Sequence, residues 1–311
     1  MKKLSFILAS ALMVVACNTN PKSEAEVEEA VPAIDLNNFD ESIARNDNFY
    51  QWATGGWQKN NPLKPEYSRY GSFDVLRENN EIRINELFEA MTKSEAAQGS
   101  VEQKISDLYK MGLDEERLNA EGAEPIREAL NTILAMTDRE ALKAQLAQLH
   151  TDGIGVFFAC YPGADLADSN YTTIYLEQGG LGMGNCDYYT KAENAELKAA
   201  YRDYLAKIFT LAGVEGDIDA MVNDVLTVED AIAAKSWTNV ECRDIQKGYN
   251  PYTREALVAE FGTIDWESYF KAMGIGEFKH LVVSQPSSFT NIMGVIDTMP
   301  VEVLRNYIAA H

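Results

Sequence analysis

The sequence predicts a mostly α-helical fold that carries one small β-hairpin. Over much of the chain after residue 73, apolar side chains recur every three or four residues with charged residues between them, the pattern of amphipathic helices. The pattern changes at Gly153, where two runs of β-branched and aromatic residues flank a turn-rich segment. At 311 residues, with 46% hydrophobic and 24% charged residues, the chain is long enough to bury a large core.

Four helices are expected before the hairpin. The apolar spacing predicts them over residues 74–91, 101–118, 123–136 and 139–150. Pro125 stands near the start of the third helix, where proline is tolerated, and Asp138 precedes the fourth. The hairpin is expected to join residues 154–161 to residues 171–176 through the segment PGADLADSN.

Helices are expected again after the hairpin. Residues 194–211 place Leu197, Tyr201, Leu205 and Ile208 on one face, and residues 217–237 form a second long apolar pattern. Shorter helices are expected over residues 253–261, 265–273, 289–297 and 301–310. A short strand is expected over residues 280–284, ahead of Pro286.

The first 17 residues are expected to be a lipoprotein signal peptide. Lys2 and Lys3 precede a short apolar run, and the sequence VVAC matches a lipobox, at which the chain is cleaved and Cys17 acylated. The run is shorter than the roughly 20 residues that span a membrane. Residues 18–35 are expected to be a flexible acidic tether to a domain over residues 36–311. We therefore expect an exported protein, lipid-anchored to a bacterial membrane; an ordinary secretory signal is the alternative.

Charge and cysteine content exclude several classes of function. The chain has 48 acidic and 27 basic side chains, a net charge of −21 that repels phosphate, so nucleic-acid binding is not expected. Besides Cys17, the cysteines are Cys160, Cys186 and Cys242, an odd number that leaves at least one free thiol. There is no Cys-x-x-Cys pair and no Gly-x-Ser-x-Gly motif, so neither a structural zinc site nor a serine nucleophile is indicated.

A dense aromatic block carries the most specific pattern in the chain. Its first part is Asp47, Phe49, Tyr50, Trp52, Ala53, Gly55, Gly56 and Trp57, and its second is Ser68, Arg69, Tyr70, Gly71, Phe73, Asp74, Leu76 and Arg77. The block resembles the opening signature of the neprilysin and endothelin-converting-enzyme family of zinc metallopeptidases. Weaker resemblances follow in the family's order at Gly180-Leu181-Gly182, Asp187-Tyr188-Tyr189, Asn250-Pro251-Tyr252 and Leu304-Arg305-Asn306-Tyr307. The resemblance therefore spans about residues 36–307.

The resemblance implies the multi-helix N-terminal capping domain of a neprilysin-like peptidase, which in relatives limits access to small peptides. Full-length relatives use zinc held by a His-Glu-x-x-His motif, and this chain has no such motif. Its histidines, His150, His280 and His311, are neither followed by Glu nor spaced four residues apart. No catalytic residue and no metal ligand is therefore assigned, and the zinc-binding C-terminal half is expected to be absent from this chain.

By the same resemblance, Arg69 binds the free carboxylate of a short peptide, and Asp74 and Arg77 belong to the same substrate-binding subsite. The chemistry suits this role, because a guanidinium offers a planar fork of donors to a carboxylate. The alternative is that the three residues form a structural ion-pair network between the aromatic block and the first long helix. Asp74 and Arg77 are close enough in sequence to pair on a helix.

Trp57 and the Gly55-Gly56 pair are interpreted as structural. Aromatic residues this dense bury large areas, so Trp57 is expected in a core. Adjacent glycines indicate a backbone that turns sharply or passes close to a ring.

The leading hypothesis is the N-terminal domain of a neprilysin-like zinc metalloendopeptidase that is inactive by itself. The runner-up is a non-catalytic, membrane-tethered lipoprotein that binds peptides through Arg69. A third possibility is a split enzyme whose zinc half is a separate chain; a gene fragment and a selected short form also stay open. The expected partners are small peptides, a missing or separate zinc-bearing half, and a membrane reached through the lipid. Zinc is a cofactor of the full-length relatives and is not expected in this chain.

Overall fold

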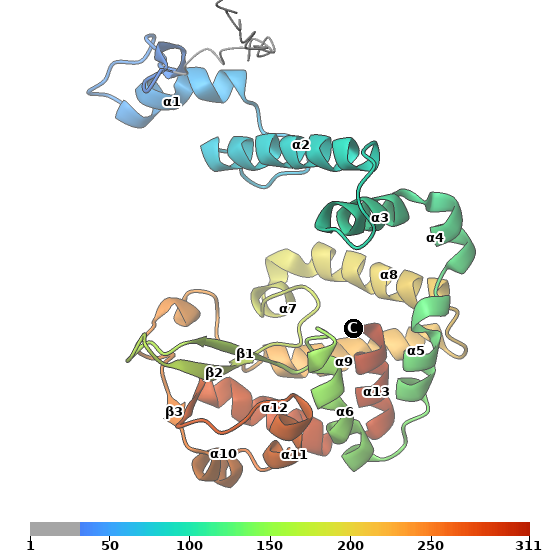
Figure 1. Ribbon diagram of the computed structural model, residues 1–311. Coiled ribbons are helices and arrows are strands. Elements are labelled where there is room, and N and C mark those ends of the chain that lie inside the picture. The colour runs from blue at the N-terminus through green and yellow to red at the C-terminus, as the bar shows by residue number, and fades with distance from the viewer. Residues whose placement is uncertain (1–31) are drawn as a thin grey trace, which may run out of the picture. The chain divides into compact units, whose positions relative to one another are not determined.

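The computed structural model describes residues 32–311, so the predicted signal peptide, Cys17 and most of the predicted tether lie outside the described residues. Within the predicted domain the chain forms two compact units, which divide between Met111 and Gly112. Figure 1 shows helices in both units and strands in the second. The predicted fold class, mostly helical with a small β element, is confirmed. Among residues 32–311, no helix combines the length and apolarity needed to cross a membrane.

The first unit contains a helix that the sequence analysis did not predict. After the 3₁₀ turn η1 (Leu36–Asn38), α1 (Phe49–Asn60) begins at Asn48, whose side-chain oxygen accepts a hydrogen bond from the Gln51 N–H at 3.0 Å. Trp52 on α1 is buried and its ring lies 4.6 Å from the ring of Phe39. The glycine pair inside α1 weakens its helix propensity, so packing and the cap decide the conformation here.

Gly55 and Gly56 lie where α1 packs closely against the segment before it. A Cβ atom at Gly56 would lie 2.1 Å from the carbonyl oxygen of Asn37, and one at Gly55 would lie 2.7 Å from Cβ of Asp40. The glycines therefore allow a close approach of α1 to the backbone before it, and the predicted sharp turn or approach to a ring is wrong. The expectation for Trp57 is wrong, because that ring is only half-buried.

The next helices show how capping residues divide the predicted segments. The predicted helix 74–91 is α2 (Ser72–Thr92), and a carboxylate oxygen of Asp74 accepts a hydrogen bond from the Gly71 N–H at 2.9 Å at its start. The predicted helix 101–118 is two helices, α3 (Val101–Leu113) and α4 (Glu115–Glu121). They divide at Asp114, because its side chain accepts a hydrogen bond from the Arg117 N–H and starts a new helix.

The second unit holds the remaining elements. Its helices are α5 (Arg127–Leu134), α6 (Arg139–Thr151), α7 (Asp187–Thr190), α8 (Ala195–Leu211), α9 (Ile218–Ala233), α10 (Arg254–Glu260), α11 (Trp266–Ala272), α12 (Pro286–Thr298) and α13 (Val301–Ala310). Three 3₁₀ turns, η2 (Glu124–Ile126), η3 (Ala192–Asn194) and η4 (Glu241–Arg243), connect them. The predicted helix 217–237 ends early, and the predicted helix 289–297 begins early at Pro286, in a position where proline is favoured.

The predicted hairpin is part of a four-stranded sheet with the order β1-β2-β4-β3. β1 (Phe158–Ala164) pairs antiparallel with β2 (Thr172–Gln178), and β2 pairs parallel with β4 (Leu281–Val283), the predicted short strand. The two-residue strand β3 (Pro251–Tyr252) was not predicted. β1 starts four residues later than expected because Phe157 has a φ of 60°, which interrupts the extended backbone before Phe158.

The core of the second unit lies between this sheet and the helices around it. α12 packs against β2 and α9, and α13 packs against α9, α5 and α6 (Figure 1). The largest fully buried side chains are Trp266, Tyr307, Phe157, Phe158, Phe209, Phe261, Phe270 and Phe289. Most of the core therefore comes from segments after residue 133, and the first unit contributes a separate, smaller set of contacts.

Candidate functional site

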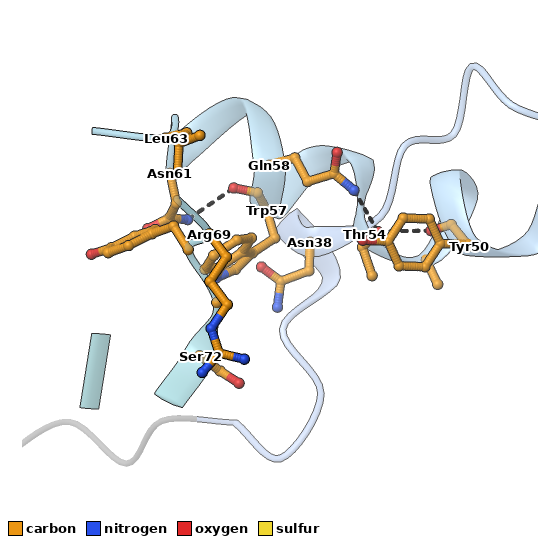
Figure 2. A pocket seen from close by; sticks show the side chains of 12 residues that line it. Asn38, Tyr50, Thr54, Trp57, Gln58, Asn61, Leu63, Arg69 and Ser72 are labelled. Atoms are coloured by element: carbon orange, nitrogen blue, oxygen red, sulfur yellow. Dashed lines mark hydrogen bonds between the residues drawn. The ribbon is translucent and has the colours of Figure 1, made fainter. Parts of the chain in front are cut away.

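The sequence-predicted peptide site lies in the first unit, beside a pocket of about 600 Å³. The pocket is formed by α1, the segment after it and the start of α2, and its lining includes Tyr50, Trp57, Asn61, Arg69, Tyr70 and Ser72 (Figure 2). Arg69 is the one charged residue among the described residues that line it. In a chain of net charge −21, a pocket with a cation and no lining carboxylate favours an anionic ligand group.

Arg69 is exposed, and no side chain in the described part of the protein uses its guanidinium as a hydrogen-bond donor. Within residues 32–311 its guanidinium makes no side-chain hydrogen bond and no ion pair. Figure 2 shows the side chain extending toward Ser72. A planar fork of N–H donors is therefore available to a carboxylate that enters the pocket.

Asp74 and Arg77 are brought together but do not line this pocket. Arg77 Nη2 lies 3.6 Å from Asp74 Oδ1, and its Nε lies 3.7 Å from Glu81 Oε1. The Arg77 guanidinium also lies 5.4 Å from the ring centroid of Tyr67. An ion-pair network thus exists at the start of α2, and Arg69 is not part of it.

Tyr70 forms a fixed aromatic wall of the pocket. Its ring stacks on Trp57 with centroids 6.1 Å apart, and its hydroxyl donates a hydrogen bond to Glu78 at 2.6 Å. Lys64 Nζ donates to the other Glu78 oxygen, also at 2.6 Å. The hydrogen bonds from Lys64 and Tyr70 lower the pKa of Glu78 to about 2, and the bond to Glu78 raises the pKa of Tyr70. The wall therefore presents a neutral tyrosine held by an ionised carboxylate.

The three histidines of the chain do not fit a zinc site. They are hydrogen-bonded at separate places in the second unit: His150 to Tyr269 at 2.6 Å and Val156 O at 3.0 Å, His280 to Asp165 at 2.7 Å, and His311 to Glu229 at 3.2 Å. Burial lowers the pKa of His150. In residues 32–311, no three His, Cys, Asp or Glu side chains are grouped so as to hold a metal ion.

A buried polar cluster around Glu229 was missed by the sequence analysis. Glu229 on α9 is fully buried, and its carboxylate accepts hydrogen bonds from the Gly182 N–H at 2.9 Å, the Tyr201 hydroxyl at 2.9 Å and the Tyr189 hydroxyl at 3.1 Å. A signal was present, because Glu229 interrupts an apolar helix face that includes Val222, Val225 and Ile232. Because the buried carboxylate is hydrogen-bonded to Gly182, the glycine-rich loop after β2 has a structural role.

Tyr307 joins two of the weaker sequence motifs. Its buried hydroxyl accepts a hydrogen bond from the Phe157 N–H at 3.0 Å and donates one to the Gly180 carbonyl at 2.9 Å. Gly180 has a φ of 73°, which favours glycine. The motifs that contain Gly180 and Tyr307 therefore form one packing contact, although about 130 residues separate them in the chain.

Comparison with known proteins agrees with the motifs and the fold. The chain is 27% identical to endothelin-converting enzyme 1 of Cavia porcellus over 305 residues, which cover 93% of this chain and 40% of that protein. It is 28% identical to the Homo sapiens enzyme of the same name, over 88% of this chain and 37% of that protein. The crystal structure of the Mycobacterium tuberculosis zinc metalloprotease Zmp1 with an inhibitor aligns with a TM-score of 0.80 and 27% identity, over 89% of this chain and 43% of that one.

The chain therefore spans about 40% of the length of the curated relatives that it matches. The family model for the N-terminal part of these enzymes, described as peptidase family M13, matches residues 46–311. Because the match covers most of its length, and the aromatic block and the helical fold agree with it, this chain belongs to peptidase family M13.

Proposed function

We propose that this chain supplies the peptide-gripping N-terminal part of a neprilysin-like zinc metalloendopeptidase and does not hydrolyse peptides by itself. The observation that carries the proposal is Arg69, a cation without an ion pair in residues 32–311 that lines an aromatic pocket. A peptide C-terminus can place its carboxylate on the guanidinium and its last side chain against Trp57 and Tyr70. Asp74 and Arg77, three residues apart on α2, would hold the rim of this subsite.

The zinc chemistry of such an enzyme is assigned to a second part, either in the same polypeptide or in a separate chain. The apolar surface of α2 supports this partner. None of its residues is buried, and its exposed large apolar side chains are Phe73, Leu76, Ile82, Ile84 and Leu87. α3 adds exposed Val101, Leu108 and Met111. Exposed apolar surface on this scale is typical of a face that packs against a partner.

The proposal that the chain is inactive alone predicts the result of a metal and activity assay. The purified chain should hold no stoichiometric zinc and show no chelator-sensitive cleavage of short peptides, because its histidines are committed to separate partners. Elemental analysis after extensive dialysis measures the metal, and a fluorogenic peptide measures cleavage. One tightly bound zinc per chain together with chelator-sensitive cleavage would contradict the proposal. Peptide binding without cleavage is the result that the proposal expects.

The Arg69 assignment predicts a selective loss of affinity in Arg69→Met. Binding of a short peptide with a free C-terminal carboxylate should weaken about tenfold to a hundredfold, since a hydrogen bond to a charged group contributes roughly 1.5–3 kcal/mol. The amidated form of the same peptide should bind the variant and the wild type alike. Isothermal titration calorimetry with the matched pair measures both affinities.

Two further variants control this experiment. Arg69→Lys keeps the charge without the planar fork and should fall between wild type and Arg69→Met. Arg117→Met removes an exposed arginine that pairs with Glu121 at 2.7 Å in the second unit, and it should leave both affinities unchanged. Equal losses for the acid and the amide peptide, or a lower unfolding temperature of Arg69→Met, would assign Arg69 to the framework of the domain instead.

We also propose that Cys17 carries the lipid that anchors the protein to a bacterial membrane on the periplasmic or cell-surface face. The Ala16–Cys17 junction supports this proposal. Cys17→Ala should block processing or move the protein from the membrane fraction to the soluble fraction, which fractionation followed by immunoblotting detects. Identical partitioning of wild type and variant would contradict it.

A further inference from the structure

Two cysteines of the second unit converge on one backbone carbonyl. Cys186 directly precedes α7, and Cys242 lies in η4, with α8 and α9 between them in the chain. The sulfur of Cys186 lies 3.6 Å from the carbonyl oxygen of Trp237, and the sulfur of Cys242 lies 3.9 Å from the same atom. The two sulfur atoms are therefore no farther apart than the sum of these two distances.

The sheet holds this carbonyl in place. The side chain of Gln178, at the end of β2, accepts a hydrogen bond from the Trp237 N–H at 2.7 Å and donates one to the Trp237 carbonyl at 2.8 Å. The same Gln178 nitrogen lies 3.7 Å from the sulfur of Cys242, and the side-chain nitrogen of Gln285 lies 3.9 Å from it. Both thiols thus lie next to a carbonyl whose position is held by hydrogen bonds. Their proximity therefore follows from the packing of β2 against the segment after α9.

The two thiols differ in solvent exposure, but the pKa of each is shifted in the same direction. Cys242 is exposed and Cys186 is buried, so a dissolved oxidant reaches Cys242 first. Burial raises the pKa of both thiols, with a further contribution from Asp187 at Cys186 and from Glu177 at Cys242. Reactive redox-sensing cysteines have lowered pKa values and electropositive surroundings. This pair instead suits a stable crosslink.

We propose that Cys186 and Cys242 form a disulfide when the protein enters an oxidising compartment, an inference that rests on the export proposed above. The oxidant is a small disulfide such as oxidised glutathione. The Cys242 thiolate attacks it, forms a mixed disulfide and releases one glutathione thiol; the Cys186 thiolate then attacks the Cys242 sulfur and releases the second. Two protein thiols lose two protons and two electrons, and the glutathione disulfide is reduced to two thiols. Formation of the bond requires the Cys242 side chain, which lies on an exposed turn, to rotate until the sulfurs are about 2 Å apart.

The crosslink also accounts for the odd number of cysteines. Cys160 is half-buried beside Tyr269, and burial raises its pKa to about 11, so it remains the free thiol. The disulfide closes a covalent loop around α8 and α9, which lowers the conformational entropy of the unfolded chain. It also ties the segment directly before α7 to η4.

The experiment uses the full chain with Cys17→Ala, so that only these three cysteines remain. The protein is equilibrated in a glutathione redox buffer, free thiols are alkylated, and non-reducing peptide mapping by mass spectrometry locates the linkage. We expect the peptides of Cys186 and Cys242 to be linked and Cys160 to be alkylated. Reduction should lower the thermal midpoint by about 5–10 °C, as expected for a loop of this length.

Matched variants separate the crosslink from other thiol chemistry. Cys160→Ala should keep the linkage and the reductant-dependent shift. Cys186→Ser should lose both and accumulate glutathione on exposed Cys242, and Cys242→Ser should lose both without taking up glutathione. Alkylation of Cys186 and Cys242 in the wild type after oxidation, or a linkage that includes Cys160, would overturn the proposal. The disulfide could form in the redox buffer while both thiols are reduced in protein isolated from cells. That result would overturn the proposal that the disulfide forms in an oxidising compartment. None of these readouts depends on peptide binding at Arg69.

Discussion

Glu229→Ala is expected to lower the free energy of unfolding of the second unit by roughly 3–5 kcal/mol, because three donors lose their acceptor and each unsatisfied buried donor costs about 1–3 kcal/mol. The carboxylate is fully buried and accepts hydrogen bonds from Gly182, Tyr189 and Tyr201, and His311 Nε2 lies 3.2 Å from it. Its removal leaves three donors without their acceptor: the Gly182 N–H, the hydroxyl of buried Tyr189 and the hydroxyl of partly buried Tyr201. Denaturant unfolding followed by circular dichroism measures the change.

Two control variants define what the loss means. Glu229→Gln keeps the shape of the side chain and one acceptor oxygen, so it should lose clearly less than Glu229→Ala. Glu196→Ala removes an exposed glutamate from α8 and should change the free energy of unfolding by a few tenths of a kcal/mol. An unfolding midpoint of Glu229→Ala equal to that of Glu196→Ala would show that the buried network contributes nothing.

Gly56→Ala is expected to destabilise the first unit by on the order of 2–3 kcal/mol, the upper part of the range for overpacking. The added methyl group would lie 2.1 Å from the Asn37 carbonyl oxygen and 2.8 Å from the Phe39 carbonyl oxygen, and both belong to backbone that cannot rotate away. Hydrogen exchange of residues 36–60 reports on this unit separately from the rest of the chain. Because Asn38 lines the Arg69 pocket, peptide binding should weaken as well.

Gly294→Ala is the matched control for this variant. Gly294 also lies inside a helix, α12, and a Cβ atom there would meet nothing within 4 Å. Alanine should therefore be neutral or stabilise the helix by up to about 1 kcal/mol. If the amide hydrogens of residues 36–60 exchanged at wild-type rates in Gly56→Ala as well as in Gly294→Ala, the close packing of α1 on the segment before it would not contribute to stability.

Helix periodicity predicted most elements of the second unit because their apolar faces are continuous. α6, α8, α9 and α13 lie within a few residues of their predicted positions. Element boundaries were predicted wrongly where a single residue determines the backbone conformation. Asp114 starts a new helix inside a predicted one, and the positive φ of Phe157 makes β1 begin later than predicted. α1 was missed because its glycine pair has low intrinsic propensity, which packing against Leu36–Asn38 overrides.

The motif around Arg69 could be read from the sequence, and its surroundings could not. The signature Ser68-Arg69-Tyr70-Gly71 predicted the residue, whereas the pocket needs Trp57 and Asn38 to be brought next to it from earlier in the chain. The sequence also placed Asp74 and Arg77 near each other, as their spacing on a helix requires. Whether Arg69 joined their ion pairs depended on side-chain directions, which spacing alone does not set.

The sequence by itself determined the family and the helical class, because these depend on residue identity and local spacing. An aromatic block, amphipathic periods and the lack of a His-Glu-x-x-His motif are all visible in the order of residues. The tertiary structure alone decided which distant side chains meet: Glu229 with Tyr189 and Tyr201, and the Cys186 and Cys242 thiols at the Trp237 carbonyl. Such contacts depend on how whole elements pack, and burial strengthens the hydrogen bonds of Glu229 by removing the competition of water.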